Sequence, residues 1–162
     1  MFELSTQSEL KCLFYSSSEI FKSGLMYILS SNFEGVDIVS YSKNNDLIPL
    51  VKRNVIDLII IDFNPNDTDS YQTLKELINV NGAVKILVFA EFMNQVHIEN
   101  LYKIGVKGFL LMTSKKYEII KAISSIAKGG RCIDTVVSEI LANEFLNNSP
   151  LQQSLTQREI QI

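Results

Sequence analysis

The chain has 162 residues, of which 46% are hydrophobic and 20% are charged, as in a globular domain of ordinary size with some residues to spare. Its net charge of -3 argues against a global basic field that would attract nucleic acid or membrane. No apolar run reaches about 18 residues and no signal-peptide pattern opens the chain, while Cys12 and Cys132 lie in apolar contexts, so we expect a cytoplasmic protein without a disulfide framework.

Apolar strands alternate with amphipathic helices along the first half of the chain. Residues 1–10 are a polar lead-in. The expected elements are a strand at 11–15, a helix with Phe21, Gly24, Leu25, Ile28 and Leu29 on one face, a strand at 36–41, a short helix at 44–53 and a strand at 55–62. Ser18 is the expected N-cap of the first helix. The last strand, VIDLIIID, is apolar without alternation, which indicates that both of its faces are buried.

The alternation continues to residue 131. The expected elements are a helix marked by Tyr71, Leu74, Leu77 and Ile78, a strand at 83–90, a helix marked by Ile98, Leu101 and Tyr102 and closed by Gly105, a strand at 108–112, and a helix marked by Ile119, Ile120, Ile123, Ile126 and Ala127 that ends at KGG. Five strand-helix pairs predict an α/β fold with a five-stranded, doubly wound parallel sheet of flavodoxin-like order 2-1-3-4-5. The functional crevice of such folds lies outside the carboxyl ends of the strands.

The pattern changes after residue 131. RCID is a candidate for a short extended piece, and residues 132–148 contain an extra amphipathic helix with Val137, Ile140, Leu141 and Phe145 on one side. Residues 149–155 form a polar linker with a proline. Thr156 and Glu159 then have capping-box spacing, but the helix that they would open has no room before the last residue. We therefore expect a truncated chain, the N-terminal part of a longer protein.

Five segments, in order and at consistent spacing, resemble one known family. They are IFKSGL (20–25), VIDLIIID (55–62), IGVKGFLLM (104–112), AISSIAKGGRCID (122–134) and LTQREIQI (155–162). Together they resemble bacterial two-component response regulators of the NarL/FixJ subfamily, which carry a LuxR-type helix-turn-helix. The resemblance implies a CheY-like receiver domain over residues 11–131 and the start of a helix-turn-helix DNA-binding domain at residues 156–162.

The resemblance assigns a chemical role to Asp62, which ends the predicted strand 55–62. In the family this aspartate accepts a phosphoryl group from a histidine kinase. A carboxylate that attacks an anionic phosphoryl group needs compensating positive charge, which Mg²⁺ supplies through oxygen ligands. The family provides an acidic pair after the first strand to hold the metal. A hydroxyl after the fourth strand and a lysine after the fifth grip the phosphoryl oxygens and couple phosphorylation to a switch.

This chain departs from the family at each of these helper positions. By spacing, the acidic pair falls on Ser16 and Ser17, the hydroxyl on Ala90 and the lysine on Met112. Phe109 does match the family's switch aromatic. Two serines cannot replace two carboxylates as Mg²⁺ ligands, because most of the negative charge is lost.

Simpler structural interpretations exist for these residues. Asp62 can cap the loop that follows it, Phe109 can be a core residue, and Met112 can be a packing residue. Glu19 can stand in as a metal ligand or can be a first-turn acid that faces the helix dipole. His97 is expected to be a solvated surface residue, and one histidine supports neither a hydrolytic triad nor a zinc site.

We therefore predict a degenerate receiver domain of a DNA-binding response regulator that is not an enzyme and needs no cofactor. It would control transcription through dimerisation or partner contacts, independently of phosphorylation. One alternative is a phosphoryl-accepting receiver that uses Asp62 with a rebuilt, Mg²⁺-binding site; another is a stand-alone receiver-like adaptor. The expected partners are a second copy of the chain, DNA through the missing C-terminal domain, and a histidine kinase or another protein, with no membrane contact.

Overall fold

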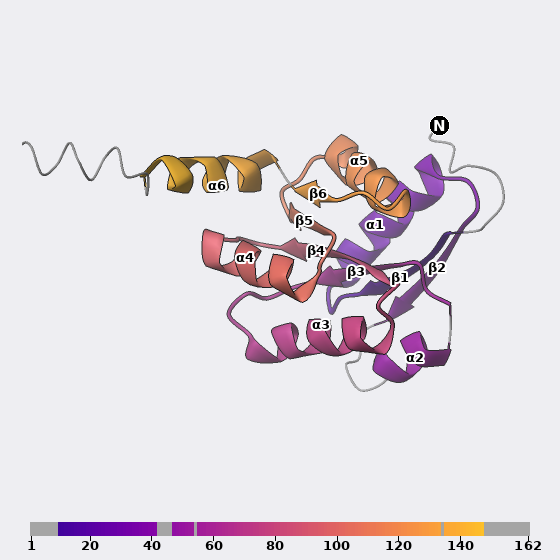
Figure 1. The fold of residues 1–162 in the computed structure, drawn as a ribbon. Helices are drawn as coiled ribbons and strands as arrows, with labels where there is room; N and C mark the ends of the chain where they lie inside the picture. The colour runs from indigo at the N-terminus through magenta and orange to yellow at the C-terminus, as the bar shows by residue number, and fades with distance from the viewer. Residues whose placement is uncertain (1–9, 42–46, 54, 134, 148–162) are drawn as a thin grey trace, which may run out of the picture.

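A computed structural model describes residues 10–41, 47–53, 55–133 and 135–147. Strands and helices alternate throughout these ranges (Figure 1). In chain order they are β1 (Leu10–Tyr15), α1 (Glu19–Asn32), β2 (Val36–Tyr41), α2 (Leu47–Arg53), β3 (Leu58–Asp62), α3 (Thr68–Val80), β4 (Lys85–Ala90), α4 (Gln95–Ile104), β5 (Gly108–Leu111), α5 (Lys116–Ala127), β6 (Cys132–Ile133) and α6 (Thr135–Asn147). Nearly all of the predicted lead-in, the start of the predicted helix 44–53, the linker and the predicted start of a DNA-binding domain lie outside the described residues.

The strands form one parallel sheet in the order β2-β1-β3-β4-β5-β6. The doubly wound fold and the predicted order of its first five strands are confirmed. The prediction of five strands is corrected to six, because β6 pairs with the outer edge of β5 through Gly108 and Cys132 and through Phe109 and Ile133. Gly129, with φ 86°, begins the turn that returns the chain to this edge after α5.

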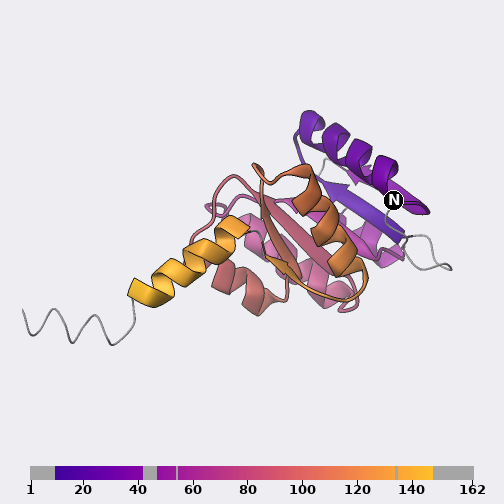
Figure 2. The ribbon, with the colours of Figure 1, turned by 90° about the horizontal axis from the view of Figure 1, so that it is seen from above.

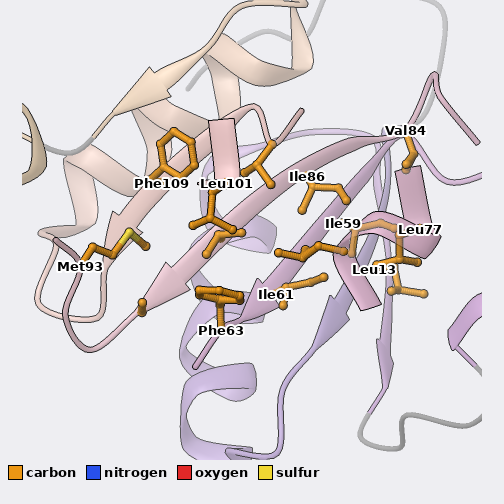
Figure 3. Close-up of a cluster of buried hydrophobic side chains, with 14 of the residues drawn as sticks. Leu13, Ile59, Ile61, Phe63, Leu77, Val84, Ile86, Met93, Leu101 and Phe109 are labelled. Atoms are coloured by element: carbon orange, nitrogen blue, oxygen red, sulfur yellow. The ribbon is translucent and has the colours of Figure 1, made fainter. Parts of the chain in front are cut away.

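Helices cover both faces of the sheet (Figures 1 and 2). One buried cluster lies between the sheet and α2, α3 and α4, and ten of its side chains are labelled in Figure 3. The other cluster lies between the sheet and α1 and α5. Along β3, Ile59 and Ile61 belong to the first cluster and Leu58 and Ile60 to the second, so the absence of alternation in this strand does reflect burial on both faces.

Local hydrogen bonds fix where several elements begin and end. Ser18 is the N-cap of α1, as predicted, and its hydroxyl accepts from Phe21 N at 3.2 Å. Gly105 ends α4 in the left-handed conformation, with φ 106°. The strand predicted at 83–90 begins only at Lys85, because Val84 N donates to Asn81 O in a turn.

Two further strands are shorter than predicted. β3 begins at Leu58 rather than at Val55, whose side chain is 74% exposed. β5 ends at Leu111, because the chain turns at Met112.

The final helix, α6, contacts α4 and β5 near its start. Val137 is fully buried in the cluster beneath α2, α3 and α4, and Leu141 packs against the same cluster. Beyond this contact, α6 points away from the body of the domain (Figures 1 and 2). Along the described ranges, no helix combines the length and apolar character that a membrane crossing demands.

Candidate functional site

Asp62 lies at the carboxyl end of β3, at the edge of the sheet where doubly wound folds place their functional crevice. The chain leaves β1 directly beside it, because Tyr15 pairs with Ile61 in the parallel register of these strands. A hollow of about 190 Å³ opens here, and Ser16, Ser17 and Asp62 are among its lining residues. The structure thus brings together the aspartate and the two serines that the sequence analysis singled out.

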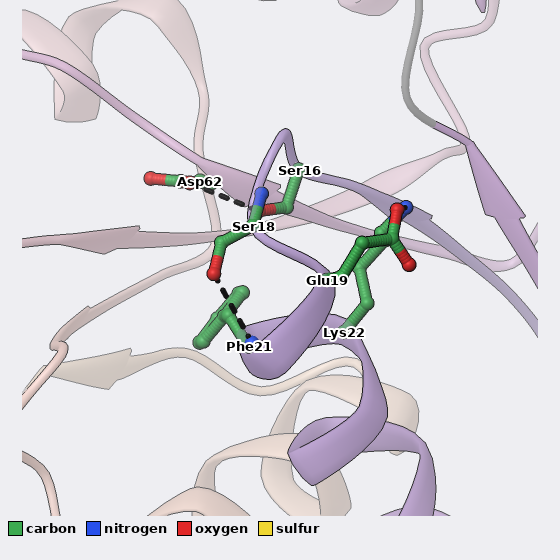
Figure 4. Close-up of polar contacts among 6 residues, drawn as sticks. All are labelled: Ser16, Ser18, Glu19, Phe21, Lys22 and Asp62. Atoms are coloured by element: carbon green, nitrogen blue, oxygen red, sulfur yellow. Dashed lines mark hydrogen bonds and ion pairs between the residues drawn. The ribbon is translucent and has the colours of Figure 1, made fainter.

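Ser16 makes the direct contact with Asp62 (Figure 4). Its Oγ donates a hydrogen bond to Asp62 Oδ2 at 2.9 Å and accepts one from Ser18 N at 3.0 Å. The Ser16 residue is only 2% exposed, whereas Ser17 is exposed. A neutral, buried hydroxyl therefore holds the carboxylate from the side where the family resemblance would place acidic metal ligands.

Carboxylates from the loop after β3 add negative charge to the hollow. Burial raises the pKa of Tyr15, and the nearby charges of Asp62 and Asp67 raise it further. Asp67 is already engaged as the N-cap of α3, where its carboxylate accepts from Asp69 N at 3.1 Å and from Ser70 Oγ at 2.9 Å. Tyr15 and Asp67 were not predicted from the sequence, although an aspartate just before a helical pattern is a recognisable N-cap signal.

The residues around Asp62 do not fit Mg²⁺. The ion favours a near-octahedral shell of oxygen ligands with carboxylates among them. Ser16 offers a neutral hydroxyl whose proton is directed at Asp62, and Asp67 is committed to capping α3. Within the described ranges, no three His, Cys, Asp or Glu side chains gather in a way that could hold a metal.

The other helper positions carry packing side chains. Ala90, at the end of β4, is fully buried, and its carbonyl accepts a hydrogen bond from Met112 N at 2.9 Å. The half-buried Met112 side chain packs against the cluster beneath α1 and α5. Phe109 is 2% exposed and belongs to the opposite cluster (Figure 3). Neither a hydroxyl nor an ammonium group is present at these two helper positions.

Glu19 does not lie beside Asp62 in this structure. It is a first-turn acid of α1, its side chain is 79% exposed, and it forms an ion pair with the buried Lys22. Figure 4 shows the Glu19 and Lys22 side chains on the side of α1 away from Asp62. The structure therefore favours the helix-dipole interpretation of Glu19.

His97 corrects a sequence prediction. It is half-buried rather than solvated, and it completes the capping box of α4. His97 N donates to Asn94 Oδ1 at 3.0 Å, while Asn94 N donates to His97 Nδ1 at 3.4 Å. The sequence pattern missed this role because capping boxes usually have Glu or Gln at this position.

Comparison with known proteins finds relatives whose sequence identity to this chain is low but whose matches cover nearly all of it. The chain is 24% identical over 156 residues to the transcriptional regulatory protein DegU of Brevibacillus brevis, and the match covers 95% of this chain and 66% of DegU. It is 23% identical over 154 residues to the response regulator protein VraR of Staphylococcus epidermidis, covering 94% of this chain and 73% of VraR. The chain thus spans about two thirds of the length of DegU. No protein-family model matches it.

Solved structures share the fold. A LuxR-family two-component response regulator from Aurantimonas sp. SI85-9A1 superposes with a TM-score of 0.76 at 18% identity, covering 86% of this chain and 99% of that one. The receiver domain of a NarL response regulator from Mycobacterium tuberculosis gives 0.66 at 21% identity, covering 76% and 99%. RcsB, solved as two dimers bound to two parallel DNAs, gives 0.72 at 18% identity, covering 82% and 66%.

Proposed function

We propose that this chain, which is related to response regulators and has their receiver fold, is a pseudo-receiver domain of a DNA-binding regulator. It acts through dimerisation or partner contacts, independently of phosphorylation. The observation that carries this proposal is the hydrogen bond from the buried Ser16 hydroxyl to the Asp62 carboxylate. Asp62 occupies the phosphoryl-acceptor position, while the groups that would make it react have been replaced.

The chemistry of phosphoryl transfer supports this proposal. Transfer to a carboxylate depends on positioning and on charge stabilisation by Mg²⁺ and by cationic or hydroxyl groups. At Asp62, a neutral hydroxyl replaces an acidic ligand, and Ala90 and Met112 supply no group that can grip phosphoryl oxygens. Asp62 instead serves as the hydrogen-bond acceptor that links the loop after β1 to the end of β3.

The test is to incubate the protein with Mg²⁺ and acetyl phosphate and to measure its intact mass. We expect no phosphoryl mass increment under conditions that label an active receiver treated in parallel. The Asp62→Asn variant is the matched control. Stoichiometric labelling that disappears in this variant would overturn the proposal in favour of the second candidate, a phosphoryl-accepting switch with a rebuilt metal site.

The same proposal includes a homodimer and a DNA-binding segment, in a cytoplasmic protein that is not an enzyme. RcsB was solved as dimers on DNA, and the DegU relative is a transcriptional regulatory protein. On this chain, Ile20 and Tyr27 lie seven residues apart on α1 with side chains 88% and 67% exposed, which makes that helix a candidate contact between copies.

Light scattering of wild type and Ile20→Glu tests the dimer. We expect the variant to be monomeric, and a wild-type protein that is itself monomeric at all concentrations would contradict this part. Gel-shift measurements on the full-length gene product separate a DNA-binding regulator from a stand-alone adaptor. An adaptor would not bind DNA.

A further inference from the structure

A groove runs between α3 and α4, away from Asp62. The two helices lie side by side on the same face of the sheet (Figure 1). The groove has a volume of about 610 Å³, which is within the usual range for small-molecule sites and too small for a folded partner. Its lining residues are Tyr71, Lys75, Ile78, Asn79, Asn100, Lys103 and Ile104.

The lining divides into an apolar floor and a polar rim. The half-buried side chains of Tyr71, Ile78 and Ile104 form the floor and pack against the core cluster beneath these helices. The rim consists of exposed amide and ammonium side chains, one of each from α3 and from α4. An amphipathic ligand could place its apolar part on the floor and its polar part against the rim.

The electrostatics of the groove favour an anion. Lys75 and Lys103 both line it, and no carboxylate does. Neither lysine forms an ion pair within the described part of the chain, although the protein as a whole carries a net charge of -3. Two like charges repel each other, and an anion between them would relieve that repulsion.

Tyr71 supplies an independent observation. Among the described residues, its hydroxyl is the buried side-chain polar atom that lacks a hydrogen-bond partner. Burial also raises the pKa of Tyr71, so the phenol stays protonated and able to donate. A buried donor without a partner costs free energy. Because protein atoms cover this hydroxyl, a ligand in the groove would accept its hydrogen bond only after the Tyr71 ring had moved.

We propose that the groove between α3 and α4 binds an amphipathic organic anion. Its apolar part lies on Ile78 and Ile104, and its acidic group lies between Lys75 and Lys103. An acceptor atom takes the hydrogen bond from Tyr71 once the ring has moved to uncover the hydroxyl. This site goes beyond the proposed function and does not depend on it, because binding requires neither phosphorylation of Asp62 nor a dimer.

The groove is physically connected to the end of β3. The Tyr71 ring packs edge-on against Phe63, with centroids 4.9 Å apart and planes at 87°. Phe63 directly follows Asp62, and its N–H donates to Phe89 O at 2.7 Å. A ligand that moved the Tyr71 ring would therefore act on the segment that carries Asp62.

Anilinonaphthalene sulfonate, a fluorescent aromatic anion, is a suitable probe for the test. We expect saturable binding to the folded protein, with amide NMR shift changes concentrated at the groove and at Phe63. The double variant Lys75→Gln/Lys103→Gln should bind about tenfold more weakly or worse, because two charge contacts are lost. The matched control is Lys121→Gln/Lys128→Gln, which removes two exposed lysines from the α5 side and should bind like wild type.

A neutral analogue isolates the role of charge. Phenylnaphthylamine has the same aromatic system without the sulfonate and should bind about tenfold more weakly to the wild-type protein. The proposal would be overturned if the two probes bound equally well, or if both double lysine variants lost the same affinity for the sulfonate. NMR shift changes located away from α3 and α4 would overturn it as well. The unchanged dispersion of the wild-type NMR spectrum during the titration verifies that the probe binds the folded state.

Discussion

Ser16 and Asp62 are 46 positions apart in the chain, yet the serine hydroxyl donates to the carboxylate at 2.9 Å from a site that is almost inaccessible to solvent. The same hydroxyl accepts from Ser18 N, one residue before α1 begins. One side chain thus joins the end of β3 to the start of α1. Ser16, which stands where the family has an acidic metal ligand, therefore has a structural function of its own.

Ser16→Ala should destabilise the domain by about 1.5–3 kcal/mol, the usual contribution of a hydrogen bond to a charged group. Urea unfolding measures the change. Ser17→Ala is the matched control: the adjacent side chain is exposed, so its loss should change the free energy of unfolding by less than about 0.5 kcal/mol. Equal effects from the two serines would contradict the importance of the Ser16 contact.

The double variant Ser16→Asp/Ser17→Asp should gain affinity for Mg²⁺, because it adds two carboxylates beside Asp62. Like-charge repulsion should lower its melting temperature in metal-free buffer, and Mg²⁺ should restore part of the loss. Thermal melts with and without Mg²⁺ measure this, and the wild-type protein should be insensitive. Ser30→Asp/Ser31→Asp, at the far end of α1, adds the same charge and should show no specific response.

The buried thiol of Cys12 makes the stability of the folded protein depend on pH in the alkaline range. Burial raises the pKa of its thiol from 9.0 to about 12, with smaller contributions from Asp57 and Asp37. Between these pH values the unfolded chain loses the proton while the folded chain keeps it, so stability falls as pH rises. The slope from this one group is about 1 kcal/mol per pH unit.

The Cys12→Ala variant tests this dependence, since it should lose less stability than wild type between pH 9 and pH 11. The raised pKa values of Tyr15 and Tyr71 act in the same direction and remain in the variant, so the difference between the two proteins isolates Cys12. Parallel pH profiles for the two proteins would contradict the burial effect.

Asn94→Ala should cost about 1 kcal/mol, because it removes the side-chain oxygen that caps α4. Asn94→Asp keeps an acceptor at the same place and should retain most of the stability. Chemical unfolding of both variants measures the difference, and a similar loss in both would show that the cap oxygen is unimportant. The exposed neighbour Val96, changed to Ala, serves as a substitution in the same helix outside the cap.

The fold was predictable because its determinants are local. The apolar residues of β3 and the helical spacing of Leu25 and Leu29 are visible within short windows, and together they define a sheet with helices on both faces. β6 was predictable only as a candidate extended piece at RCID, because two residues carry no periodicity. Its pairing depends on the turn at Gly129 and on the edge that β5 leaves available.

The candidate site was only partly predictable. Spacing from the family placed Ser16 and Asp62 near each other, but the direction of the hydrogen bond depends on a rotamer and on the register between β1 and β3. Tyr71 was identified as a helix-face residue, and sequence alone does not reveal that its hydroxyl lacks a partner. Such features arise from packing between elements, which no single segment encodes.

The way α6 packs against the domain determines where its C-terminal half points. The helix has 13 residues, so it spans about 20 Å at 1.5 Å per residue. It is held along its first half by Val137 and Leu141. The six residues beyond Leu141 extend about 9 Å, so a tilt of roughly 10° would move the far end by about 1.6 Å. The direction in which these residues leave the domain is therefore set by a small apolar contact with α4 and β5, so repacking of that contact would redirect them.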